Sequence, residues 1–209
     1  MKIQKQIPRI STRGYYDLLT GKKLKNKLYY LYPKKYFAKL QVSEIVIMVH
    51  GLRNNKKDAV SKFIIAQKQL YKLHYKHPVI GYSYDSNTKG AHIKKTALRA
   101  LLVGQKIAER NGTDLAQFIL DFKKKNPKIK IRLMGHSLGS QVILSAIRKL
   151  ASKKNTKNII ESIHFFGASI ADDSMHLKKD GKHTQKVVHK KIKNYYSPTD
   201  EVLKEAEKI

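Results

Sequence analysis

The sequence predicts an α/β fold, a mostly parallel sheet with helices on both faces. Strand-like and helix-like patterns alternate from residue 44 onward, which is typical of parallel strands joined by right-handed crossovers. The strand-like segments are short continuous apolar runs, as expected of strands buried on both faces. A chain of 209 residues suits one core. We therefore expect a single domain, residues 1–209, made of an N-terminal region 1–43 and a core 44–209.

The N-terminal region is basic and rich in tyrosine, and its pattern predicts an antiparallel hairpin. Residues 15–19 and 27–32 have strand-like composition and flank the turn-like Thr20-Gly21-Lys22. We expect this hairpin to open the sheet.

The core alternates strands with helices. Apolar runs predict five strands, at residues 44–49, 78–83, 130–134, 159–166 and 187–196. Helical spacing predicts helices at residues 58–73 with Asp58 as N-cap, at 91–125 with a break at Asn111-Gly112, at 141–150, and in the last residues. No sixth strand follows, so we expect the last strand of the sheet to be missing from this sequence.

Composition places the chain among globular proteins. Hydrophobic residues make up 41% and charged residues 28%, and no apolar run reaches the roughly 18 residues of a membrane-spanning helix. The basic start lacks the apolar stretch of a secretory signal. Without cysteine, a disulfide, a thiolate metal site and a cysteine nucleophile are excluded. We expect a cytoplasmic protein.

The formal net charge of +29 raises the question of an anionic partner. The 44 basic residues divide evenly, 22 before residue 101 and 22 after, and seven of them are arginine. An even, lysine-dominated excess is typical of a solvated surface, because arginine is preferred for bidentate phosphate recognition. Weak electrostatic association with an anionic membrane or nucleic acid is therefore the partner hypothesis.

One motif carries specific chemistry, the G-x-S-x-G pattern Gly135-His136-Ser137-Leu138-Gly139. It begins directly after the predicted strand 130–134 and runs into the predicted helix 141–150. A nucleophile elbow requires this setting, because its serine sits on a turn too sharp for side chains two residues before and after it. The helix that follows points its free N–H groups toward developing negative charge. Ser137 is the candidate nucleophile.

The sequence around these residues resembles the α/β-hydrolase superfamily, in its esterase- or lipase-like branch with a Gly-His-Ser-Leu-Gly elbow. His50-Gly51-Leu52, which closes the strand predicted at 44–49, is similar to the oxyanion loop of that family. The resemblance implies that the backbone N–H groups of Leu52 and Leu138 form the oxyanion hole. It also implies a serine hydrolase acting on a carboxylic ester or related acyl bond of a small molecule, with no metal or other cofactor.

The resemblance further implies an acid and then a histidine after the nucleophile. Asp200 follows the fifth predicted strand, where the family places its acid, and Asp172-Asp173 after the fourth strand are an alternative acid pair. His50 precedes the nucleophile, so we interpret it as a loop-packing residue. No histidine follows Asp200.

Three explanations stay open for the missing base. The favoured one is truncation of a longer protein, because an end at Ile209 would also leave the sheet edge beyond the fifth strand uncovered. Alternatively, the chain is a catalytically inactive binding module with a hydrolase fold, or His176 or His189 supplies the base. On the first explanation the 209-residue chain is nearly inactive, since losing one triad member costs about 10⁴-fold or more in rate.

Overall fold

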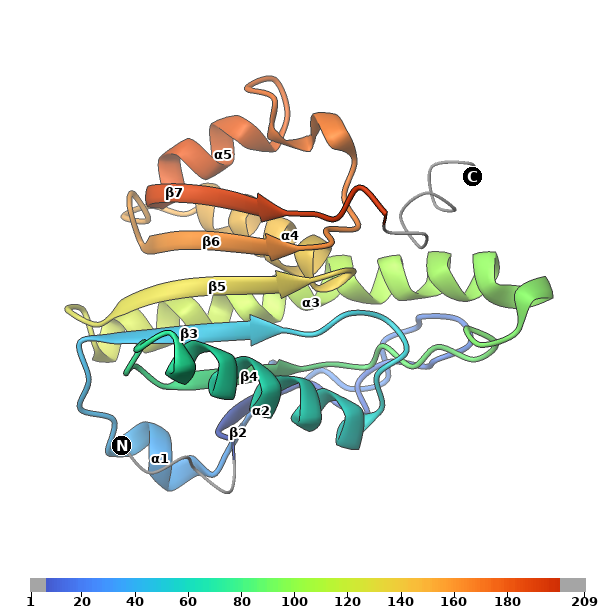
Figure 1. Cartoon of the computed structure of the whole chain (residues 1–209), viewed down its shortest axis with the longest axis horizontal. Helices are drawn as coiled ribbons and strands as arrows, with labels where there is room; N and C mark the ends of the chain where they lie inside the picture. The colour runs from blue at the N-terminus through green and yellow to red at the C-terminus, as the bar shows by residue number, and fades with distance from the viewer. Residues whose placement is uncertain (1–6, 200–209) are drawn as a thin grey trace.

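A seven-stranded sheet forms the centre of the computed structural model, which describes residues 7–199 (Figure 1). The strands lie in the spatial order β2-β1-β4-β3-β5-β6-β7. Their bounds are β1 Arg9–Ser11, β2 Tyr30–Tyr32, β3 Glu44–Val49, β4 Val79–Ser83, β5 Lys130–His136, β6 Ile160–Phe166 and β7 Val188–Tyr195. The five strands predicted in the core are confirmed as β3 to β7.

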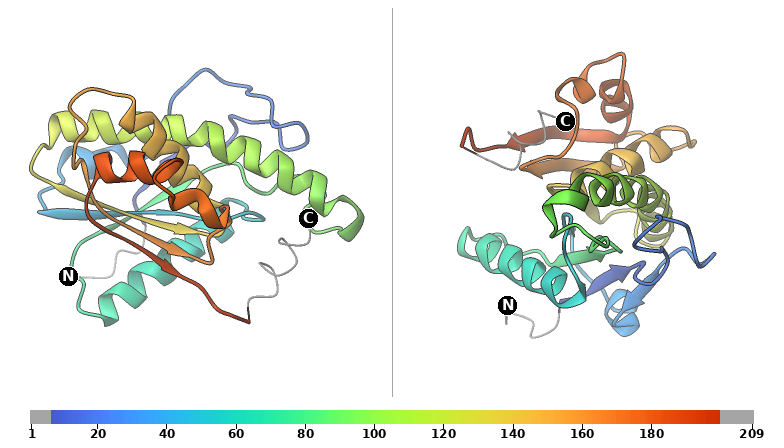
Figure 2. Two further views of the ribbon diagram at one scale, coloured as in Figure 1. Left: turned by 90° about the horizontal axis from the view of Figure 1, so that it is seen from above. Right: turned by 90° about the vertical axis from the view of Figure 1, so that its right-hand side faces the viewer.

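Helices cover both faces of the sheet, as Figure 2 shows. On one face lies α2 (Lys56–Lys72), and on the other lie α3 (Ala97–Lys125), α4 (Gly139–Ala151) and α5 (Asp180–Val187). Three shorter elements connect them: α1 (Lys34–Ala38) and the 3₁₀ turns η1 (Lys94–Thr96) and η2 (Asp172–Met175). The predicted fold class is confirmed.

The antiparallel pair that opens the sheet consists of β1 and β2, whereas all other neighbouring strands are parallel. The hairpin prediction is therefore right about an antiparallel pair and wrong about one of its strands. Residues 15–19 form a loop, with an isolated bridge between Tyr16 and Lys23. The buried carboxylate of Asp85 holds this loop, because it accepts hydrogen bonds from consecutive backbone N–H groups, those of Gly14, Tyr15 and Tyr16.

The break predicted at Asn111-Gly112 is wrong, because α3 runs through both residues. A Cβ built at Gly112 would lie 2.3 Å from Ser145 Cβ of α4, so glycine here allows the two helices to approach closely. Asn111 is buried and donates a hydrogen bond to the Ile107 carbonyl. Both residues thus serve helix packing, which local turn propensity cannot report.

Two further helix predictions need correction. The N-cap of α2 is Asn55, whose side chain accepts hydrogen bonds from two backbone N–H groups, while Asp58 completes the capping box from the first turn. Helix α5 was not predicted, because its sequence is short and polar. Its Asp180 is paired with Arg148 of α4 at 2.8 Å, so a tertiary contact supports it.

The carboxyl ends of β3 to β7 lie along one edge of the sheet, as the arrowheads in Figure 1 show. Loops 50–55, 84–93 and 167–171 and the turn after β5 all begin there. In α/β sheets this edge is where ligands bind. No helix within residues 7–199 is long and apolar enough to cross a membrane.

Candidate active site at the carboxyl edge of the sheet

Ser137 occupies the turn between β5 and α4 and has a positive φ of 50°. A residue with a side chain rarely adopts this left-handed conformation. Backbone hydrogen bonds hold it: the Ser137 N–H donates to the Phe166 carbonyl at 3.0 Å, and the Ser137 carbonyl accepts from the Ser140 N–H at 2.9 Å. The partly exposed Ser137 side chain is thereby held just beyond the end of β5.

The two glycines that flank Ser137 lie where a side chain would collide with neighbouring atoms. A Cβ at Gly135 would lie 2.9 Å from Ile143 Cδ1 of α4. A Cβ at Gly139 would lie 2.4 Å from the Val49 carbonyl oxygen, at the end of β3. The first turn of α4 therefore packs directly against the backbone of β3.

Gly51 brings a second loop to the same turn. A Cβ at this position would lie 2.9 Å from Ser137 Cβ and 3.2 Å from His136 Nδ1. Without a side chain, the loop that follows β3 can lie against Ser137.

The Leu52 and Leu138 amides lie on these two adjacent segments. Among residues 7–199, neither N–H donates a hydrogen bond to another group of the chain. The two side chains meet at the same point of α3, because a Cβ at Gly104 would lie 2.5 Å from Leu52 Cδ1 and 3.2 Å from Leu138 Cδ2. Within the part of the chain that the structure describes, two amides free to donate thus flank the turn that carries Ser137.

His50 is fully buried, with both ring nitrogens engaged. Its Nδ1 lies 2.9 Å from the Gly51 carbonyl oxygen, so Nδ1 carries the proton. Its Nε2 accepts from the Tyr84 N–H at 3.2 Å and from Arg13 Nη2 at 3.0 Å. Burial, followed by the nearby Arg13 charge, lowers the pKa of His50 to about 3. The ring is neutral and anchors the loop.

Arg13 is a structural partner of this loop that the sequence analysis missed. Its guanidinium donates to Ser83 Oγ and the Asn54 carbonyl, both at 2.9 Å, and to the Asn55 carbonyl at 3.2 Å. Burial lowers the pKa of Arg13 from its usual value. No sequence signal distinguishes this arginine from the other six, because two of its four acceptors are backbone carbonyls and all of them lie at least 37 positions away along the chain.

Ser169 is the second residue that the sequence analysis missed. Its Oγ lies 3.2 Å from Ser137 Oγ, and its N–H donates to the Ser137 carbonyl at 3.4 Å. Ser169 follows β6, the neighbour of β5, so the two parallel strands bring the two hydroxyls together. Ser169 follows the strand predicted at 159–166, and this position alone would have indicated that it lies at the same edge of the sheet as Ser137.

Of the predicted acids, Asp172 and Asp173 lie on η2, after β6. Asp200 lies outside the described residues. Asp173 pairs with Lys179, chiefly through a side-chain hydrogen bond that lowers its pKa, and Asp172 is exposed. No group of three or more His, Cys, Asp or Glu within residues 7–199 could hold a metal ion.

The two upstream histidines differ in position. His189 lies near the start of β7 and 3.3 Å from Glu161, whereas the end of β7 pairs with the end of β6 beside the Ser137 turn. The six residue steps from His189 to Tyr195 at the end of β7 span about 20 Å, so His189 cannot reach Ser137 while β7 is intact. His176 is exposed on the loop after η2.

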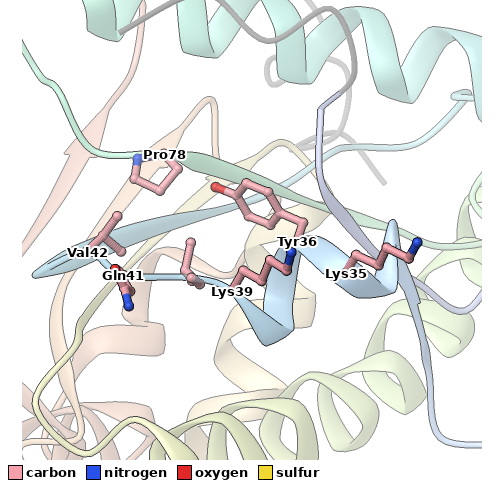
Figure 3. Close-up of a pocket in the computed structure, with 7 residues that line it drawn as sticks. Lys35, Tyr36, Lys39, Gln41, Val42 and Pro78 are labelled. Carbon is pink, nitrogen blue, oxygen red and sulfur yellow. The ribbon is translucent and has the colours of Figure 1, made fainter.

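The described residues line two hollows on the surface of the protein. One, of about 450 Å³, lies between α1 and the residues before β3 and β4, at the edge of the sheet opposite Ser137. In Figure 3 the Tyr36 ring points across it toward Pro78. The other, of about 470 Å³, lies between α3, α4 and the segment after β6. Its lining includes Ile170, the residue after Ser169, so it adjoins the candidate site.

Comparison with known proteins identifies a family. The profile described as "Alpha/beta hydrolase of unknown function (DUF900)" matches residues 34–209. No curated protein sequence matches the chain at a significant level.

Solved structures give a likeness in fold. Trichoderma reesei cutinase with a phosphonate inhibitor is 15% identical, with a TM-score of 0.44, and the match covers 77% of this chain and 64% of that structure. An acetylxylan esterase is 14% identical, with a TM-score of 0.38, and the match covers 60% of this chain and 63% of that structure. An extracellular α/β-hydrolase of a Paenibacillus species is 17% identical, with a TM-score of 0.32, and the match covers 61% of this chain and 41% of that structure. The chain thus covers less than two thirds of each of these proteins.

Proposed function

Because the chain belongs to the family of α/β hydrolases of unknown function (DUF900), we propose that it is a serine hydrolase acting on a carboxylic ester or related acyl bond. Ser137 Oγ attacks the acyl carbonyl, its proton passes to a general base, and the alcohol leaves with a proton. Water then attacks the acyl-serine, which releases the acid and restores Ser137. The substrate is a small molecule with an acyl group.

The observation that carries the proposal is the conformation of Ser137. Its φ of 50° lies on a strand-to-helix turn whose neighbouring glycines pack against the backbone of β3 and against α4. A strained residue of this kind persists only where the surrounding contacts over-determine it, and such residues cluster at active sites. The strain holds the hydroxyl beyond the strand end, where a substrate carbonyl can approach.

The second support is the two backbone amides that have no acceptor within residues 7–199. The Leu52 and Leu138 N–H groups belong to the two segments that touch Ser137, and neither donates to another group within the described residues. Negative charge develops on the carbonyl oxygen during attack, and preorganised N–H donors stabilise it. One such donor is worth about 10²–10³ in rate. The donors are backbone groups, so the Leu side chains serve packing against α3.

The acid of the proposed triad is Asp200, which follows β7 in sequence. The structure describes the chain to residue 199, and a histidine base completes the proposed mechanism. The buried, hydrogen-bonded His50 is not that base, since neither of its nitrogens is free.

A fluorophosphonate probe tests the proposal directly, because it phosphonylates an activated serine. The expected result is one label, located on Ser137 by peptide mass and absent in Ser137→Ala. Ser61→Ala, at an exposed position on α2, is the matched control and keeps the label. A probe that leaves the full-length native protein unlabelled, or that labels another serine equally, contradicts the proposal.

One observation favours a second candidate function, a binding module that keeps the fold without turnover. The hydroxyl of Ser137 is paired with another hydroxyl, that of Ser169, which is not a base at neutral pH. Such a protein would bind an acyl ligand at the same edge. Hydrolysis of short p-nitrophenyl esters by the native protein, lost in Ser137→Ala, excludes this candidate. Saturable ligand binding without product formation favours it.

A further inference from the structure

Helix α3 extends well past the sheet on the side of the candidate site. Gly104 lies against Leu52 and Leu138, at the level of the Ser137 turn. The seven residues before it, 97–103, therefore extend about 10 Å beyond that level. In Figure 1 this end of α3 projects beyond the carboxyl ends of the strands.

The projecting end exposes large apolar side chains. Leu98 and Leu102, one helical turn apart, are 45% and 57% exposed, and Ile93 in the preceding turn is 59% exposed. Single exposed apolar residues are ordinary, but a run of them along a projecting helix marks an interaction surface. Leu102 lines the same hollow as Ile170, which follows Ser169, so the surface is continuous with the candidate site.

The charged residues of this stretch of sequence all have one sign. Residues 89–106 contain five basic residues and no acidic residue. The five are all exposed: Lys89, Lys94, Lys95, Arg99 and Lys106. The first acidic residue of α3 is Glu109, which lies beyond Gly104, so the projecting end carries only basic charge.

We propose that residues 89–106 form a docking surface for an anionic lipid membrane, and that the ester cleaved belongs to a lipid of that membrane. The leucines enter the interface while the lysines and the arginine contact the lipid headgroups. The choice of substrate class rests on the proposed hydrolase function. Docking in this orientation brings the hollow beside Ser169 to the membrane surface.

The composition of the docking surface favours lipid over nucleic acid. Surfaces that bind single-stranded nucleic acid combine basic residues with aromatic rings on which bases stack. Residues 89–106 contain no Phe, Tyr or Trp, and they expose aliphatic side chains instead. Aliphatic side chains gain free energy in acyl chains and none on a phosphate backbone.

Vesicle flotation of the Ser137→Ala chain tests the docking without turnover. Vesicles of phosphatidylcholine with 30% phosphatidylglycerol should bind the protein, and pure phosphatidylcholine should bind it far less. Lys94→Gln with Lys95→Gln should lower the partition coefficient about 25-fold, because each basic residue near an anionic surface is worth about fivefold. Leu98→Ser with Leu102→Ser should lower it at least tenfold.

Matched controls lie on α2, which packs on the opposite face of the sheet. Lys68→Gln with Lys72→Gln removes the same charge from two exposed positions of this helix, and Leu73→Ser removes a leucine that directly follows it and is 75% exposed. Both should change binding less than twofold. Equal losses in the control and docking variants would overturn the proposal in favour of diffuse attraction by net charge.

Two further outcomes separate the alternatives. If the docking variants lose duplex DNA binding while vesicle binding is unchanged, residues 89–106 bind nucleic acid and the lipid proposal is wrong. Fluorophosphonate labelling of Ser137 is measured in parallel on the full-length native protein without substitutions. Labelling without vesicle binding refutes the docking surface alone, whereas vesicle binding without labelling refutes the hydrolase function and the substrate class.

Discussion

Replacement of Gly139 by alanine tests the packing that holds the Ser137 turn. The added Cβ would lie 2.4 Å from the Val49 carbonyl oxygen and 2.8 Å from the His50 carbonyl oxygen. An ordinary carbon–oxygen contact is about 3.3 Å, so α4 and the end of β3 must separate by roughly 1 Å. Both obstacles are backbone atoms, which cannot rotate away as a side chain can.

The free energy of unfolding should fall despite a better helix-forming residue. Overpacking costs typically 1–3 kcal/mol, and the rigid neighbours place this site at about 3. Alanine in place of glycine in a helix returns about 1 kcal/mol. The net loss of about 2 kcal/mol corresponds to a fall in Tm of about 4–8 °C for a domain of this size.

Gly139→Ala should also slow fluorophosphonate labelling of Ser137 in protein that remains folded. A displacement of about 1 Å between Ser137 and the Leu52 amide can cost about 100-fold in rate. Thermal unfolding and fluorophosphonate labelling of folded protein at 20 °C measure the two effects separately. Gly104→Ala is the comparison, because its closest obstacle is the flexible end of the Leu52 side chain, and it should change stability by less than about 1 kcal/mol. A Gly139→Ala protein with unchanged Tm and labelling would refute this account of the turn.

Two further predictions concern buried polar groups. Arg13→Gln should lower the free energy of unfolding in urea by about 3 kcal/mol, because it leaves loop carbonyls without their charged donor. Arg13→Lys should not restore the loss. A loss below about 0.3 kcal/mol would contradict this account. Asp114 is buried, one of its oxygens has no partner within the described residues, and burial raises its pKa to about 6. The folded state therefore holds the Asp114 proton between pH 4 and 6 while the unfolded chain releases it, so stability falls as pH rises through this window. Asp114→Asn should stabilise the protein by about 1–2 kcal/mol at pH 8 and less at pH 4.5, and an equal gain at both pH values would contradict the assignment.

Local patterns in the sequence were sufficient for the five core strands and for the candidate nucleophile. The continuous apolar runs that became β3 to β7 are buried between two layers, and this burial requires the pattern itself. Ser137 could be recognised because the turn restricts its own neighbours: Gly135 and Gly139 report the steric limits of a few adjacent residues.

Contacts between distant segments were decided by the tertiary structure alone. The pairing of β1 with β2, the continuation of α3 through Gly112, and the Ser137–Ser169 contact each depend on which backbone lies alongside. Arg13 is the clearest case, since three of its hydrogen bonds go to Ser83 Oγ and to two backbone carbonyls of the loop after β3. Every residue has a carbonyl, so no side-chain pattern marks an acceptor of this kind. Sequence periodicity records which face of an element is buried, whereas the partner of a backbone acceptor is determined only when the chain has folded.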